Sequence, residues 1–87
     1  MKLVKSAVAG TLESNDVFVE IEPAENIDIE IESIVFAQFG DDIRTSVEDV
    51  LNEMGVKGAK VALNDHGALD CVIRARLETA VLRASEV

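Results

Sequence analysis

Apolar and polar residues alternate with a period of two in the first third of the chain. In residues 17–22 (VFVEIE) and 27–32 (IDIEIE), aliphatic side chains fall on one face and mainly acidic side chains on the other. Residues 3–11 (LVKSAVAGT) are also compatible with a strand, and Pro23 ends the second strand because it has no amide proton to donate. This alternation is typical of an antiparallel sheet covered on one side, so the three segments predict a β-meander.

The apolar spacing then changes to that of a helix. Between residues 36 and 54, apolar positions recur every three or four residues, which predicts a helix with one buried stripe. Ser33 is a candidate N-cap, and Gly55 is a candidate residue just after the helix end. Gly40 costs about 1 kcal/mol relative to alanine inside a helix, so a shorter helix from Asp41 is the alternative to the longer one we favour. The predicted stripe consists of Phe36, Phe39, Ile43, Val47, Val50 and Met54.

Residues 58–63 (GAKVAL) predict a fourth strand, closed by a turn at residues 64–67, and a second helix follows to residue 84. Its apolar residues form two strips, which predicts packing on the sheet and on either the first helix or a partner subunit. The main strip is Leu69, Val72, Ile73, Leu77, Ala80, Val81 and Ala84, and the second ridge is Cys71, Ala75 and Leu82.

Together these elements predict a single domain over residues 1–87 of the α+β class. We expect a two-layer sandwich, order βββαβα, in which two helices cover one face of a mainly antiparallel four-stranded sheet.

Charge narrows the range of partners. The net charge is −9, and residues 13–53 contain thirteen acidic residues but a single basic one, Arg44. Nucleic acids and anionic membranes are bound through basic patches, so neither is an expected partner. An acidic surface suits docking on basic patches of other proteins, although acidity also serves solubility alone.

The single cysteine, Cys71, cannot form an internal disulfide, and the first ten residues are too short and too interrupted for a secretory signal. We therefore expect a cytoplasmic protein.

Few residues offer chemistry of their own. His66 is the only histidine, no pair of cysteines or histidines has zinc-site spacing, and we expect no metal site and no catalytic residue. Cys71 lies near a helix start, where a thiol can become reactive, but a cysteine on an apolar ridge is more often buried and inert. The last predicted helix carries three arginines, Arg74, Arg76 and Arg83. They could bind phosphate groups or, as we favour, form ion pairs with Glu78 and the acidic face of the sheet.

Two stretches nevertheless point to a family. Residues 5–16 (KSAVAGTLESND) and 67–84 (GALDCVIRARLETAVLRA) closely resemble the acyl carrier protein of citrate lyase, its gamma chain, and residues 38–44 (QFGDDIR) also fit. The resemblance implies a non-catalytic carrier subunit whose partners are the catalytic alpha and beta chains and a prosthetic-group transferase. Asn15 stands where the family usually has a second serine.

The resemblance further implies that Ser14 carries phosphoribosyl-dephospho-coenzyme A, linked through a phosphodiester. The thiol of this group would hold acetyl and citryl thioesters while citrate is cleaved to acetate and oxaloacetate. The flanking Glu13 and Asp16 are expected either to close the turn, which we favour, or to act as groups that are recognised by a partner or that repel the arm.

Three other functions remain open from the sequence. They are the carrier subunit of malonate decarboxylase, which uses a related group, an unmodified adaptor that binds through its acidic sheet, and an acyl-transfer enzyme that uses Cys71.

Overall fold

The structure is a computed structural model that describes residues 1–34 and 36–85, except for the side chains of residues 36–39. Four strands and two helices follow each other in the expected order βββαβα. The elements are β1 (Ala7–Gly10), β2 (Val17–Glu22), β3 (Ile27–Ser33), α1 (Phe36–Glu53), β4 (Ala59–Asp65) and α2 (Asp70–Ser85).

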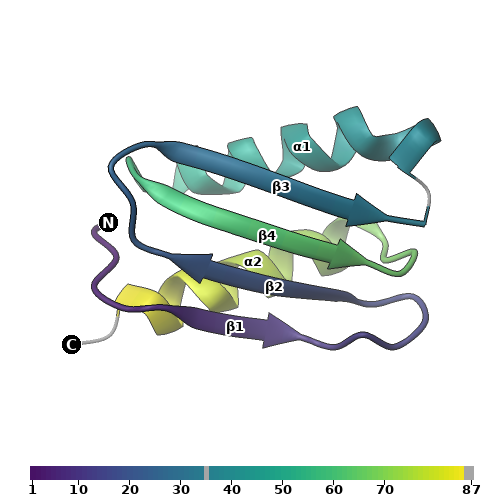
Figure 1. Cartoon of the computed structure of the whole chain (residues 1–87), viewed down its shortest axis with the longest axis horizontal. Helices are drawn as coiled ribbons and strands as arrows, with labels where there is room; N and C mark the ends of the chain where they lie inside the picture. Colours follow the sequence, from purple (N-terminus) through teal and green to yellow (C-terminus); the bar gives the residue numbers. More distant parts are fainter. Residues whose placement is uncertain (35, 86–87) are drawn as a thin grey trace.

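The chain forms two layers, with both helices on one face of the sheet (Figure 1). Helix α2 packs on β1 and β2, α1 packs on β3, and the two helices contact each other. Neither described helix has both the length and the hydropathy that crossing a membrane requires. The α+β sandwich predicted from the sequence is confirmed.

The predicted meander is wrong in one respect, because β2 and β3 are not neighbours. The strand order is β1-β2-β4-β3, so β4 lies between them. The pairs β1–β2 and β2–β4 are antiparallel, whereas β3 and β4 are parallel. The sheet is therefore mixed, and α1 provides the crossover between the two parallel strands.

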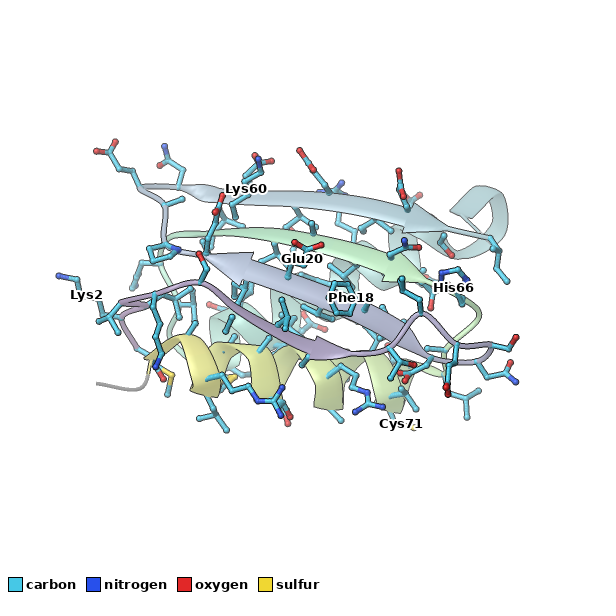
Figure 2. The ribbon with its side chains drawn as sticks, turned by 60° about the horizontal axis from the view of Figure 1, so that its bottom comes forward. Lys2, Phe18, Glu20, Lys60, His66 and Cys71 are labelled. Atoms are coloured by element: carbon cyan, nitrogen blue, oxygen red, sulfur yellow. The ribbon has the colours of Figure 1, made fainter. Side chains whose placement is uncertain are left out.

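The charges on the outer side of the sheet favour the position of β4 between these two strands. We call the side of the sheet away from the helices the open face. On this face, direct pairing of β2 with β3 would bring their rows of carboxylates side by side, which is unfavourable. Instead Lys60 of β4 lies between Glu22 and Asp28, and Ala62 lies between Glu20 and Glu30. Figure 2 labels Phe18, Glu20 and Lys60 among the side chains of this face.

The core lies between the sheet and the helices, where the alternating residues of β2 and β4 meet the helix stripes. Every aliphatic residue that was expected on the inner face of β2 is buried, as are most of the main strip of α2. At the edge strand β3 burial is weaker, since Ile29 is buried but Ile27 is exposed. The buried aliphatic residues contributed by the described parts of the helices are Ile43, Val47, Val50, Leu51, Ile73, Leu77, Ala80, Val81 and Ala84.

Helix α1 includes Gly40, so the longer of the two predicted helices is confirmed. Ser33 is the last residue of β3 and not the N-cap. The predicted stripe positions Phe36 and Phe39 have side chains outside the described part of the chain. Strand β4 extends to Asp65, two residues beyond its predicted end.

Candidate functional site

The connection between β1 and β2, residues 11–16, carries Ser14 at its tip, and we call it the serine turn. Ser14 is exposed, and the amide of Asp16 closes the turn by donating to the carbonyl oxygen of Glu13 at 3.2 Å. Asn15 has a φ of 64°, a conformation that asparagine adopts more readily than most residues. The turn therefore presents the Ser14 side chain to solvent on a defined backbone.

The carboxylate of Asp16 holds the serine turn to the rest of the fold. It accepts hydrogen bonds from Thr11 Oγ1 at 2.7 Å and from the amide of Val17 at 2.8 Å. Arg76 of α2 donates to it from Nε at 3.1 Å and from Nη2 at 2.8 Å, forming a two-point ion pair. The bonds from Arg76, and then from Thr11, hold the pKa of this carboxyl well below its usual 3.8. Asp16 thus has the turn-closing role, the one we favoured of its two expected roles.

The segment after β4 supports the other side of the turn. The amide of Asn15 donates to the carbonyl oxygen of His66 at 2.8 Å, and the amide of His66 donates to that of Asp16 at 2.9 Å. A Cβ atom at Gly67 would lie 3.7 Å from Asn15 Oδ1 and 3.7 Å from Ile34 Cδ1, so all three residues are close neighbours. The serine turn is thus held by residues about fifty and sixty positions further along the chain.

We expect Asp16→Asn to destabilise the fold by about 2 kcal/mol near neutral pH, because a hydrogen-bonded charge is lost beside Arg76. The lowered pKa of Asp16 means that its carboxylate stabilises the folded state above 3.8, and that this stabilisation is lost as pH falls through the folded-state pKa. The difference between wild type and variant should therefore shrink in acid. Urea unfolding at neutral and acid pH measures it.

Asp28→Asn is the matched control for this variant, because Asp28 is exposed on the edge strand β3. Its effect should stay below about 0.5 kcal/mol. Equal effects of the two substitutions at both pH values would contradict the structural role of the Asp16–Arg76 pair.

Asp65 is a structural residue that sequence reasoning missed, since it was expected only as part of the turn at residues 64–67. It is only 1% exposed, and its carboxylate accepts hydrogen bonds from Ser33 Oγ at 2.7 Å and from the amide of Ala68 at 2.9 Å. Its carbonyl oxygen also accepts the amide of Ile34 at 3.3 Å. Asp65 thereby connects the ends of β3 and β4 at the same end of the sheet as the serine turn. Its position in the alternation of β4, two residues after Leu63, was the available signal.

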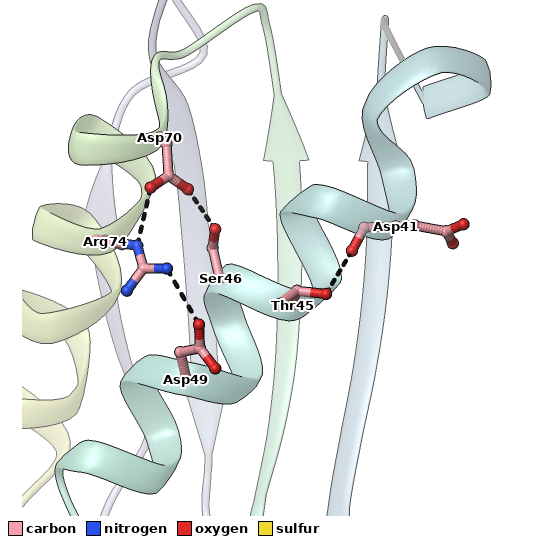
Figure 3. A network of polar contacts seen from close by, with 6 residues as sticks. All are labelled: Asp41, Thr45, Ser46, Asp49, Asp70 and Arg74. Carbon is pink, nitrogen blue, oxygen red and sulfur yellow. Dashed lines mark hydrogen bonds and ion pairs between the residues drawn. The ribbon is translucent and has the colours of Figure 1, made fainter.

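Two of the three arginines of α2, Arg74 and Arg76, form ion pairs, as favoured, but with other partners than those expected. Arg76 binds Asp16, and Arg83 donates to the carbonyl oxygen of Val8 at 2.8 Å. Arg74 pairs with Asp70 at 2.9 Å and with Asp49 of α1 at 3.2 Å (Figure 3). In the same network Ser46 of α1 donates to Asp70, so these side chains connect the two helices. The predicted partners, Glu78 and the sheet face, were wrong because α2 lies across the inner side of the sheet.

Cys71 is exposed, contrary to the expectation that a cysteine on an apolar ridge is buried (Figure 2). The whole second ridge faces outward, because α2 uses its main strip for both the sheet and α1.

The lone histidine, His66, has a buried Nε2 atom without a hydrogen-bond partner among the described residues. Within the same described part, no three histidine, cysteine or acidic residues are grouped as metal ligands would be.

Comparisons with known proteins bear on this site. The family model of the malonate decarboxylase delta subunit matches residues 4–84. The citrate lyase acyl carrier protein of Haemophilus influenzae (strain PittEE) is 51% identical over 86 residues, which cover 99% of this chain and 90% of the relative. Its counterpart from Haemophilus ducreyi is 54% identical with the same coverage. That from Edwardsiella ictaluri is 53% identical and covers 100% of this chain and 91% of the relative.

Among solved structures, a Pseudomonas malonate decarboxylase hetero-tetramer in complex with malonate contains a similar chain. Its TM-score is 0.80 at 22% identity, and the match covers 91% of this chain and 82% of that one. At this identity the likeness shows a shared fold.

Proposed function

The chain belongs to the citrate lyase acyl carrier protein family, and from this premise we propose that Ser14 is the residue to which its prosthetic group is attached. Membership makes the chain a non-catalytic carrier subunit of a multisubunit complex, and an acyl carrier of this family implies a prosthetic group. We propose phosphoribosyl-dephospho-coenzyme A as that group. Its thiol would supply the thioester linkage that holds acetyl and citryl units.

The single observation that carries this proposal is the exposed position of Ser14 at the tip of a braced turn. Attachment needs the hydroxyl oxygen to bond to a phosphorus atom of the donor, while the hydroxyl proton leaves and the donor's leaving group departs with the electrons of the broken P–O bond. An exposed hydroxyl permits this displacement. The serine turn carries two carboxylates, those of Glu13 and Asp16. The charge of Asp16 is matched by Arg76, so one of the two is already paired when the anionic donor approaches.

The rigid anchor also serves the carrier once it is modified. An arm fixed at one defined point keeps the acyl group at a high effective concentration near each active site that the arm can reach. We propose that those sites belong to citrate lyase alpha and beta chains in the cytoplasm, and that residues 1–87 act as one carrier domain.

The related alternative is that this chain is the carrier subunit of malonate decarboxylase. The observation that supports it is the matching family model, which is described as the malonate decarboxylase delta subunit. The three relatives described above, at 51%, 54% and 53% identity, are citrate lyase acyl carrier proteins, however, whereas the malonate decarboxylase structure is 22% identical. The catalytic chains that purify with this subunit would separate the two functions.

The proposal is tested by the intact mass of the chain isolated within its native complex, followed by peptide mapping. We expect an added mass equal to the proposed group on the peptide that contains Ser14. An unmodified chain in an active native complex would refute the carrier site and favour an adaptor that binds through the acidic open face. Chain produced in a foreign host is unsuitable, because the attaching enzyme is not guaranteed there.

A further inference from the structure

Three large apolar side chains stand out by their exposure. Ile34 is 71% exposed, Leu69 is 70% exposed and Leu12 is 57% exposed, the highest values among the large apolar residues that the structure describes. The remaining exposed members of this class range from 40% to 51%. Burying a leucine or isoleucine is worth about 2 kcal/mol, and the fold gains little of this from these three. Leu69 was even expected in the buried strip of α2.

All three residues lie at the same end of the molecule, around Ser14. Leu12 belongs to the serine turn, Ile34 directly follows β3, and Leu69 lies between β4 and α2. The strand directions bring the end of β1, the start of β2 and the ends of β3 and β4 to this one end, on the right of Figure 1. We call Leu12, Ile34 and Leu69 the serine-end surface.

A contact distance links this surface to the turn itself. The Cδ1 atom of Ile34 and the Oδ1 atom of Asn15 each lie 3.7 Å from the position that a Cβ would take at Gly67. The tip of Ile34 and the side chain of Asn15, the residue that follows Ser14, thus both lie against Gly67. Single exposed apolar residues are common on protein surfaces, but here the three most exposed gather around one proposed modification site.

The proposed chemistry requires another protein at this end. Before modification, Ser14 has no long arm, since its hydroxyl oxygen is one carbon away from the backbone. The attaching enzyme must bring this oxygen to the phosphorus of its donor, so its surface must contact the residues around the serine turn. Apolar side chains that become buried at such a contact supply affinity, as they do at the centres of other interfaces.

We propose that the serine-end surface docks on an apolar rim around the active site of the enzyme that attaches the prosthetic group. This inference rests on the proposed function of Ser14. The acidic open face is a poor alternative for this contact, because its side chains project perpendicular to the strands and not from their ends.

The experiment compares unmodified wild-type chain with Leu12→Ser, Ile34→Ser and Leu69→Ser as substrates of the purified attaching enzyme and its donor. Initial rates are followed by intact mass over a range of carrier concentrations. We expect KM to rise about tenfold in at least one variant, with kcat nearly unchanged, as for loss of an apolar interface anchor. Leu82→Ser is the matched control, because Leu82 is 51% exposed near the other end of α2.

Each outcome has a definite meaning. Leu12→Met and Ile34→Val keep apolar area and should retain a wild-type KM. Unchanged unfolding curves show that the serine variants are folded.

If wild type is modified on Ser14 while all three serine variants behave like Leu82→Ser, the docking surface is refuted and the modification site stands. If wild type is not modified on Ser14, the proposed function fails first. A wild-type chain that dimerises unless Ile34 is replaced would assign the surface to a second copy and overturn the proposal.

Discussion

Ser14→Ala is expected to give a folded carrier that still assembles into its complex. The resulting complex should have no measurable activity. The substitution removes one exposed oxygen atom, so stability should change by less than about 0.5 kcal/mol. It also removes the only atom at this position that can form the ester bond to phosphorus. The expected readouts are a chain that stays at its unmodified mass and a loss of acyl exchange and citrate cleavage by the reconstituted complex.

Two controls sharpen this result. Ser6→Ala alters another exposed serine, outside the serine turn, and should leave both modification and activity unchanged. The double variant Ser14→Ala/Asn15→Ser places a hydroxyl at the next residue, whose φ of 64° directs its side chain differently. We expect no rescue. Activity retained by Ser14→Ala would assign the carrier role elsewhere or remove it.

Gly10→Ala is expected to cause the largest loss of stability among single methyl additions to the serine turn and its flanks. Gly10 ends β1 with a φ of +89°, and a Cβ atom there would lie 1.9 Å from the carbonyl oxygen of Val17. Backbone strain and a clash with a backbone atom each cost about 1–3 kcal/mol, so we expect about 4 kcal/mol in total. Thermal unfolding should then occur about 15–30 °C lower in a domain of this size.

Gly67→Ala separates the two causes of this loss. Gly67 also has a positive φ, +88°, but its nearest neighbours would lie 3.7 Å from an added Cβ, an ordinary contact distance. It should cost only the strain of about 1–2 kcal/mol. Equal losses in the two variants, measured by urea unfolding, would show that the approach of Val17 contributes nothing.

Local patterns in the sequence were enough to predict the elements of this fold, but not the order of its strands. Strand β2 and the central part of α1 follow directly from their apolar spacing. The position of β4 is a relation between three strands, as on the open face, where Lys60 lies between Glu22 and Asp28. No periodicity within one strand reveals such a relation between three strands.

The site was predicted in the same partial way. Ser14 was identified by resemblance to a family, and its exposure at a turn was expected from the polar residues around it. The brace formed by Arg76 was not predictable, because sixty residues separate it from Asp16 and the five acidic residues of the predicted strands at 17–22 and 27–32 were equally plausible partners. The exposure of Cys71 escaped prediction because a helix with two apolar strips need not bury both. Leu69 is exposed because α2 begins one residue after it, at Asp70, so Leu69 does not share the buried face of the helix.

The way in which the serine turn is held has a consequence for the order of events during protein synthesis. The amide and carbonyl groups of His66 and the guanidinium of Arg76 are synthesised about fifty and sixty residues after Ser14. Until then the turn lacks the partners that organise it. An enzyme that recognises the organised turn would pass over nascent chains and act on completed ones, so the attached group would mark carriers that have finished folding.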